Sequence, residues 1–411
     1  MEKNVCFMVA TMFLAVGLVY GDIDPELKNF LAHSRQERVA VVGIGDSNQR
    51  FGGHGWSEYM ADSFQQHFGA FGTGVILCAN TVADQANGTK NSGAPEPLDI
   101  TAFSYWYLPS GVNQKLNWDI AGLLVPANHP LNIKGNLEYQ LVYGTFKESG
   151  GSIRPTVRMD KAPYTALQSL AIINTDADIV ALKSATLTID ADPNRDYPLR
   201  FSPAPTPSVI SGPSLLAYAT VVNSEKNSGC SYQTLYAVGG HSLFDMLTNL
   251  KKRSTDGIAT YFQAIRNTLN GRKSCLIMIN SGLNDLHAKG KSFSPEGSDI
   301  SSSPDSYRNN LLKLVRLLEG AWIKAGGAKE TIFFVFMPSH PISTPDNPML
   351  VSYRQAAAEL AKMLPNAACI MLPELVSQET MDKGGYYDKA SKYHLSRIGY
   401  QKISEAVVEK L

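Results

Sequence analysis

The chain has 411 residues, of which 44% are hydrophobic and 18% are charged, a composition that fits a globular protein with a large core. Its 37 lysine and arginine residues are balanced by 37 aspartate and glutamate residues. A balanced chain lacks the basic surface that marks proteins binding nucleic acid or an anionic membrane, so we expect no nucleic-acid partner.

The first 21 residues are typical of a secretory signal peptide. Lys3 supplies the positive start, residues 5–20 are mainly apolar, and Gly21 offers a small residue for cleavage. The apolar run is short for the roughly 20 residues that span a membrane. We therefore predict a signal peptide over residues 1–21, a secreted or periplasmic protein, and no membrane span in the mature chain.

A strand and a helix are predicted next. Residues 38–44 (RVAVVGI) are largely apolar, as in a buried strand, and residues 56–68 (WSEYMADSFQQHF) have the spacing of an amphipathic helix. We assign them to the first part of an α/β domain, residues 22–85.

The region from about residue 73 to residue 228 has a different pattern. Short alternating runs such as LEYQLVYGTF and ATLTIDA are separated by proline, glycine, asparagine and threonine. This pattern predicts an antiparallel β-sandwich inserted over residues 86–222. The alternative is a set of surface loops, but roughly 150 residues without structure are implausible in a compact domain.

The second part of the α/β domain is predicted over residues 223–411. Strands are expected at 232–238, 274–280, 331–337 and 368–372, and helices at 242–250, 303–327 and 396–411. Together with the first unit they predict a five-stranded, doubly wound parallel sheet with helices on both faces.

Four sequence stretches carry candidate catalytic residues, and all four follow strands or precede the last helix. Ser47 in GDSN follows the first strand, where Gly43 and Gly45 are expected to allow a tight turn. A serine there is either a turn residue or a nucleophile. Gly240 in VGGHS follows the second strand and would expose a backbone N–H to a ligand, or would simply form a turn.

The other two stretches supply an amide and a base. Asn284 in GLND follows the third strand, where its amide would donate to an oxyanion or form an Asx turn. His394 in YHLSRIGY precedes the last helix, and histidine is the usual general base because an unperturbed imidazole has a pKa of about 6.5. Each residue alone has an ordinary structural explanation, but all four are expected at one edge of the same sheet.

This Ser, Gly, Asn, His order resembles the SGNH (GDSL-type) hydrolase superfamily over the two α/β stretches. The resemblance implies a flavodoxin-like fold with Ser47 as nucleophile and His394 as general base. It also implies an oxyanion hole formed by the Ser47 backbone N–H, Gly240 and Asn284. It implies no cofactor and no metal.

One position departs from the family pattern. The family has aspartate three residues before the catalytic histidine, where this chain has Ser391. Asp388 would orient His394 if the loop is rearranged; otherwise Ser391 or a backbone carbonyl would hold the ring as part of a Ser–His dyad. Asp285 is expected to anchor its own loop instead.

The inserted β region has a parallel in the same family. Some exported members that act on O-acetylated polysaccharides, including peptidoglycan, resemble this chain in carrying a carbohydrate-binding-like β-sandwich between the serine and glycine blocks. Aromatic residues of the insert would then stack on sugar rings, or else fill the sandwich core. These residues are Tyr105, Trp106, Tyr107 and Trp118.

The resemblance predicts an exported esterase that removes O-acetyl groups from a polysaccharide or oligosaccharide substrate. A polysaccharide O-acetyltransferase would use the same acyl-enzyme but pass the acetyl group to a sugar hydroxyl. A non-catalytic carbohydrate-binding protein on the same scaffold is the third alternative, which only the Ser391 position favours.

Four cysteines remain after the predicted signal peptide. Cys78 and Cys230 fall at the two seams of the insertion, so they either form a disulfide or are unpaired small hydrophobic residues. Cys275 and Cys369 are expected on the third and fifth strands, which the fourth strand separates if the strand order is 2-1-3-4-5. Two strand spacings of about 4.8 Å exceed the roughly 7 Å limit between bridged Cα atoms, so these two should stay reduced.

Overall fold

The structure is a computed structural model, and it describes sixteen stretches of the chain. They are residues 25–49, 55–77, 106–108, 118–119, 135–145, 152–158, 167–169, 173–174, 177–178, 181–191, 199–203, 214–252, 254–287, 303–342, 346–390 and 392–411. The predicted signal peptide, Cys78, Tyr105 and Ser391 lie outside the described residues.

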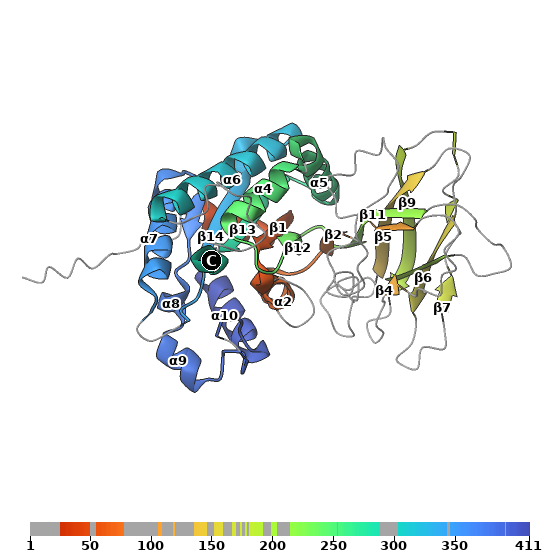
Figure 1. Cartoon of the computed structure of the whole chain (residues 1–411). Helices are drawn as coiled ribbons and strands as arrows, with labels where there is room; N and C mark the ends of the chain where they lie inside the picture. The colour runs from red at the N-terminus through yellow and green to blue at the C-terminus, as the bar shows by residue number, and fades with distance from the viewer. Residues whose placement is uncertain are drawn as a thin grey trace, which may run out of the picture.

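A five-stranded parallel sheet forms the centre of the α/β part (Figure 1). Its order is β12-β1-β13-β14-β15, which is the 2-1-3-4-5 order of flavodoxin-like sheets. The strands are β1 (Arg38–Gly45), β12 (Gly229–Ala237), β13 (Cys275–Ser281), β14 (Ile332–Pro338) and β15 (Ala367–Cys369). Because all neighbours are parallel, their carboxyl ends meet at one edge of the sheet.

Helices cover both faces of this sheet, as predicted for a doubly wound fold. On one face pack α4 (Leu243–Lys252), α5 (Ser254–Thr268), α6 (Pro304–Lys324) and α7 (Pro348–Met363). On the other pack α1 (Pro25–His33), α2 (Trp56–Phe68), α10 (Arg397–Lys410) and the short α8 (Leu372–Leu375) and α9 (Gln378–Lys383). Figure 1 shows α4 and α6 on one side of the sheet and α2 and α10 on the other.

The alternation of side chains along the strands divides the core into two layers. On β1, Ala40, Val42 and Ile44 belong to the layer under α4–α7, whereas Val39 and Val41 belong to the opposite layer. Both sets are fully buried, so the strand reads as a continuous apolar run rather than an alternating one.

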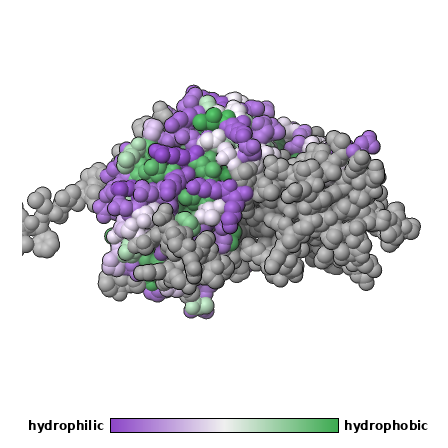
Figure 2. All heavy atoms as spheres, turned by 45° about the horizontal axis from the view of Figure 1, so that its top comes forward, coloured by the Kyte–Doolittle hydropathy of each residue, from purple (hydrophilic) through white to green (hydrophobic). Residues whose placement is uncertain are grey.

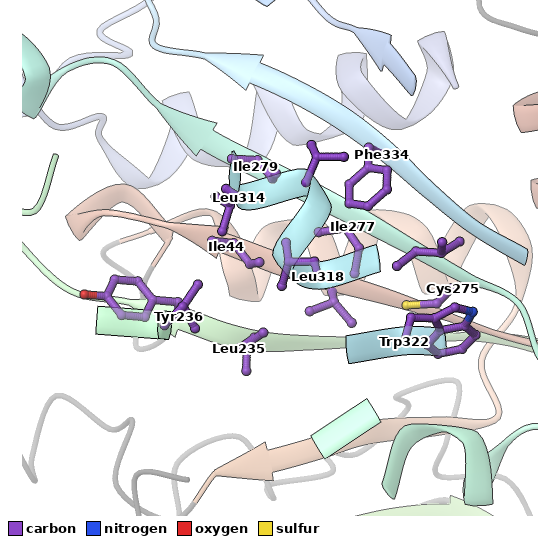
Figure 3. Packing of buried hydrophobic residues seen from close by; sticks show 14 of the residues in the cluster. Ile44, Leu235, Tyr236, Cys275, Ile277, Ile279, Leu314, Leu318, Trp322 and Phe334 are labelled. Carbon is purple, nitrogen blue, oxygen red and sulfur yellow. The ribbon is translucent and has the colours of Figure 1, made fainter. Parts of the chain in front are cut away.

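Helix α6 shows how one helix closes the first layer. Ser303 caps its start by accepting from the Ser306 N–H, and Pro304 occupies the first turn, where a missing N–H costs nothing. Leu314, Leu318 and Trp322 then point at the sheet one helical turn apart (Figure 3).

The predicted antiparallel β region contains two antiparallel sheets, which Figure 1 shows to one side of the α/β part. One sheet has β2 (Gly72–Leu77), β3 (Trp106–Leu108), β5 (Gly135–Thr145), β9 (Ala181–Ala191) and β11 (Ser214–Asn223). The other has β4 (Trp118–Asp119), β6 (Ser152–Arg158), β7 (Leu167–Ser169), β8 (Ile173–Asn174) and β10 (Leu199–Pro203). That the two sheets pack as a sandwich stays a prediction, as does sugar stacking by Trp106, Tyr107 and Trp118.

The antiparallel pairing begins earlier in the chain than the predicted insertion. β2 pairs with β11 from Gly72 onward, ahead of residue 86. Gln233 on β12 connects this sheet to the parallel one, because its Oε1 accepts from the Val75 N–H (2.7 Å) and its Nε2 donates to the Val41 carbonyl (3.2 Å). Gly74 has a left-handed backbone (φ 74°), and a Cβ there would overlap the Gln233 amide.

The fifth parallel strand is shorter than predicted. It ends at Cys369 instead of residue 372, because Leu372 and Pro373 already form the first turn of α8. The other predicted strands and helices of the α/β part agree with the observed ones to within a few residues.

The described cysteines are free thiols. Cys230 is fully buried and is a free thiol, so of the two alternatives for Cys230 the structure has the unpaired one. Burial raises the pKa of this thiol to about 12. Cys275 on β13 and Cys369 on β15 are also free, and β14 separates them as predicted.

The surface of the described part is mixed in polarity. On the face that Figure 2 shows, the coloured residues are mostly hydrophilic, with smaller apolar areas between them. Within the stretches that the structure describes, no helix combines the length and the apolar character needed to cross a bilayer.

Candidate active site

Ser47 lies at the carboxyl edge of the parallel sheet. β1 ends just before it, and Ser47 opens a short 3₁₀ turn, η1 (Ser47–Gln49). Asp46 starts the turn: its carbonyl accepts from the Gln49 N–H (3.0 Å), and its Oδ1 accepts from the Asn48 N–H (2.8 Å). The turn holds half-buried Ser47 in the crevice where open α/β sheets bind ligands.

The structure brings Ser47 and His394 together. His394 Nε2 lies 2.9 Å from Ser47 Oγ, although the two residues are 347 positions apart in the chain. With Nε2 as the acceptor, the serine hydroxyl donates along the path that a general base uses to remove its proton. This contact is the feature that a nucleophile–base pair requires.

The glycines before Ser47 act differently from our expectation. Gly43 and Gly45 are strand residues of β1 without a left-handed backbone, so they do not make the turn. A Cβ on Gly43 would overlap the Gln49 amide, and one on Gly45 would lie 2.8 Å from Gln49 Cβ. The glycines leave room for Gln49, whose Nε2 donates to Tyr232 Oη (2.7 Å) and Ser57 Oγ (3.0 Å). Gln49 thereby anchors the nucleophile turn to β12 and α2.

Asn284 is held next to the nucleophile turn by Asp46. Asn284 opens a 3₁₀ turn after β13, and its Nδ2 donates to Asp46 Oδ2 (2.9 Å). Asp46 is only 1% exposed, so this carboxylate is an internal anchor and not a surface charge. A side-chain amide has a second N–H, which the predicted oxyanion role would use.

Gly240 follows β12 in a left-handed conformation with φ 78°. A Cβ at this position would meet no atom within 4 Å, so backbone conformation rather than crowding favours glycine here. The residue therefore borders open space at the same sheet edge as Ser47 and Asn284.

Asp285 fastens the glycine and asparagine stretches to each other. Its carboxylate accepts from the Leu243 N–H at the start of α4 (3.2 Å) and from the Gly282 N–H (3.1 Å). It therefore anchors its own loop, as expected, and also fixes that loop to α4.

Asp388 does not reach the imidazole through its carboxylate. Its Oδ1 accepts from the Ala390 N–H (2.7 Å), whereas its backbone N–H donates to the His394 carbonyl (3.0 Å). Among the described residues, no acidic side chain hydrogen-bonds to the His394 ring.

Asn48 is a site residue that the sequence did not single out. Its Oδ1 accepts from the Tyr400 hydroxyl (2.6 Å), and its Nδ2 lies 3.4 Å from the Tyr393 carbonyl oxygen. It thus joins the nucleophile turn to the residue preceding His394. Its place directly after the serine was the only signal, and any turn residue would give the same one.

In the part of the chain that the structure describes, no group of three or more histidine, cysteine, aspartate or glutamate side chains is arranged to hold a metal ion.

No protein-family model matches the chain, and no curated protein matches it. Solved structures similar to it include a Bacillus subtilis protein, at 12% identity over 86% of this chain and 92% of that one, with a TM-score of 0.33. A family two carbohydrate esterase from Cellvibrio japonicus has 11% identity, covers 74% and 96% of the two chains, and has a TM-score of 0.30. An acetyl xylan esterase (Est2A) from the rumen bacterium Butyrivibrio proteoclasticus has 8% identity, coverage of 82% and 97%, and a TM-score of 0.30. These TM-scores are low, and the likenesses decide nothing about the chemistry of this chain.

Proposed function

We propose that this protein is a serine esterase that removes O-acetyl groups from a polysaccharide through an acyl-enzyme on Ser47. The observation that carries the proposal is the 2.9 Å contact between Ser47 Oγ and His394 Nε2 at the carboxyl edge of the parallel sheet. A serine needs such a base within hydrogen-bond reach in order to attack an ester carbonyl at neutral pH.

In the first half-reaction Ser47 Oγ forms a bond to the acetyl carbonyl carbon while His394 Nε2 takes the hydroxyl proton. The resulting tetrahedral intermediate collapses by breaking the bond to the sugar oxygen, which receives that proton from His394. In the second half-reaction water attacks the acetyl-serine, His394 takes the water proton and returns it to Ser47 Oγ, and acetate leaves.

The oxyanion of both tetrahedral intermediates needs donors that are already in place. We assign this role to the backbone N–H groups of Ser47 and Gly240 and to the side chain of Asn284. The bond from Asn284 Nδ2 to Asp46 Oδ2 (2.9 Å) supports the assignment, because it holds the amide in one orientation before substrate binds.

The base in this proposal acts as part of a Ser–His dyad. Asp388 has its carboxylate on the Ala390 N–H, so it contributes to His394 through its backbone and not through a carboxylate–imidazole bond. The backbone around His394 then has the task of keeping the imidazole oriented.

The substrate class rests on the antiparallel region and on the predicted export. Residues 72–223 hold two antiparallel sheets between the serine and glycine stretches, the position at which the polysaccharide esterases that the sequence resembles carry a carbohydrate-binding-like domain. An acetylated polysaccharide outside the cytoplasm fits both features.

The direct test is hydrolysis of p-nitrophenyl acetate and release of acetate from acetylated polysaccharides by the purified protein. Ser47→Ala should lower kcat by at least about 10⁴-fold without changing the fold, because the nucleophile is gone. Ser352→Ala, on the surface of α7, is the matched control and should keep full activity. Equal rates for the Ser47 variant and the unmodified protein would refute the proposal.

A second measurement tells hydrolysis from transfer. With an acceptor glycan present, an esterase releases one acetate per acetyl group lost, whereas a transferase forms acetylated acceptor instead. Stoichiometric acetate supports the esterase.

A further inference from the structure

His340 is a buried histidine outside the serine–histidine pair. It follows β14 in the segment Ser339-His340-Pro341, and its side chain is only 1% exposed. Its Nε2 lies 3.0 Å from the backbone carbonyl oxygen of Lys392. Because a carbonyl only accepts, the proton of the neutral ring must reside on Nε2, and His340 donates to the loop that carries His394.

Three consecutive carbonyls of that loop are hydrogen-bonded. The Lys392 carbonyl accepts from His340 Nε2, and the Tyr393 carbonyl lies 3.4 Å from Asn48 Nδ2. The His394 carbonyl accepts from the Asp388 N–H at 3.0 Å. The loop is therefore held by its backbone on both sides of the imidazole.

The segment that carries His340 is itself fixed to the sheet. The Ser339 N–H donates to the Ser281 carbonyl on β13 (2.9 Å), and the Ser339 carbonyl accepts from Arg354 Nε (2.7 Å). Arg354 is buried on α7 and pairs with Asp346. The backbone just before His340 is therefore hydrogen-bonded to β13 and α7.

A second contact joins the same two segments. The Tyr387 hydroxyl donates to the Pro341 carbonyl (2.8 Å), and Tyr387 forms a β-bridge with Leu395, the residue after His394. Tyr387 restrains the loop at Leu395, just after His394, whereas His340 bonds to the carbonyl of Lys392, two residues before it. The His340 bond acts on the two residues that precede His394, together with the Asn48 contact to the Tyr393 carbonyl.

We propose that His340 is a positioning residue that holds the His394 imidazole on Ser47 by donating from Nε2 to the Lys392 carbonyl. This inference rests on the proposed function, since it assigns to His340 the orienting task that a carboxylate performs in a Ser–His–Asp triad. His340 touches neither substrate nor the reacting atoms, and it acts through the backbone between Lys392 and His394.

The competing explanation is that His340 only fills space in the core. The two explanations differ in what a substitution changes. A space-filling role predicts loss of stability with an unchanged kcat in the folded protein, whereas positioning predicts loss of kcat at a nearly unchanged KM.

Two substitutions separate these outcomes. His340→Phe keeps the ring volume and removes the donor, and His340→Gln places an amide N–H near the position of Nε2. With p-nitrophenyl acetate, at a temperature where both are folded, we expect kcat to fall roughly 10- to 100-fold in the Phe variant, with KM within about twofold. The Gln variant should recover to within about threefold of the unmodified protein. His67→Phe, at an exposed position of α2, is the matched control.

The result that overturns the proposal is a Phe variant with the kcat of the unmodified protein, or a Gln variant as impaired as the Phe variant. Should the Phe variant fail to fold, His340→Asn replaces it, because the shorter amide does not reach the Lys392 carbonyl.

A second readout does not need activity. In protein labelled with ¹⁵N-histidine, the His394 ring signals, assigned by their loss in His394→Ala, should change in the Phe variant and be restored in the Gln variant. Unchanged signals in the Phe variant overturn the role of His340 whether or not the protein hydrolyses esters. Absence of esterase activity in the unmodified protein with the predicted NMR changes refutes only the proposed function.

Discussion

At the scale of single residues, Asp46 combines two tasks with one buried carboxylate. Its Oδ1 accepts from Asn48 and its Oδ2 accepts from Asn284, so the nucleophile turn and the amide donor share one anchor. Replacing an acceptor oxygen with an NH₂ group places a donor against a donor at one of these contacts.

Asp46→Asn should therefore lower kcat for p-nitrophenyl acetate roughly 10- to 100-fold, since a misoriented oxyanion donor costs about as much as a removed one. Steady-state kinetics check this result. The matched control is Asp305→Asn on the exposed first turn of α6, which should leave kcat unchanged. A fully active Asp46 variant would show that Asn284 does not depend on this anchor.

Asp388 is one of the groups that the sequence offers for orienting the His394 ring. Its carboxylate binds the Ala390 N–H and not the His394 ring, so Asp388→Asn should change kcat by no more than about threefold. His394→Ala should be as damaging as Ser47→Ala, because base and nucleophile act as one unit. Steady-state assays of Asp388→Asn, His394→Ala and Ser47→Ala under the same conditions check both expectations. A loss of about 10³-fold or more in the Asp388 variant would support a triad with a rearranged loop instead of a dyad.

At the scale of elements, β1 positions the nucleophile turn through the absence of side chains at Gly43 and Gly45. Gly43→Ala should force Gln49 away from Tyr232, destabilising the fold by roughly 1–3 kcal/mol and lowering kcat. Urea unfolding and esterase kinetics measure the two effects. The matched control is Gly320→Ala on α6, where a Cβ meets no atom within 4 Å. That change should stabilise the protein by about 0.5–1 kcal/mol. A Gly43 variant as stable as the unmodified protein would contradict the packing argument.

At the scale of the whole molecule, the antiparallel region shares a core with the α/β part. Phe71 and Val75 from the start of the region, and Val142 and Val222 within it, belong to the same buried cluster as residues of the parallel sheet. Deleting residues 88–217 removes Val142 and exposes Phe71 and Val75.

That deletion should therefore lower the Tm and reduce hydrolysis of both polymeric and small esters. Thermal unfolding and assays with acetylated polysaccharide and p-nitrophenyl acetate check this. A deletion variant that keeps its Tm and its small-ester activity would show that the region is a separable module.

The buried His340 also links global stability to pH. Burial lowers its pKa to about 4, with Arg354 and His394 acting in the same direction and the Lys392 carbonyl and Asp346 opposing them. An unfolded histidine titrates at about 6.5, so the unfolded chain binds the proton first as the pH falls. The stabilisation is complete above about pH 6.5, and it is lost between there and about pH 4.

Over that range the free energy of unfolding should fall by about 3 kcal/mol through His340 alone. Urea unfolding at pH 7 and at pH 4.5 measures the fall, and His340→Gln should remove this share of it. An equal pH dependence in both proteins would mean that His340 is not the group responsible.

Local patterns in the sequence predict the parallel sheet and the four stretches at its edge. Apolar runs and helix caps are local properties, and the topology of consecutive strand–helix units follows from connection rules. The pairing of Ser47 with His394 came from the resemblance of the four stretches to the SGNH superfamily, and the two side chains lie 2.9 Å apart in the structure.

The groups that support that pair could not be predicted from local patterns, because they come together through tertiary contacts. The roles of Asp46, Asn48 and His340 depend on hydrogen bonds to residues far along the chain, and a buried histidine or aspartate has no local pattern that distinguishes it from a surface one. Asp388 differs, because its carboxylate accepts from the N–H of Ala390, only two residues along the chain. The sequence gives the identity of each side chain, but packing of the folded chain decides which hydrogen-bond partner a buried polar group has.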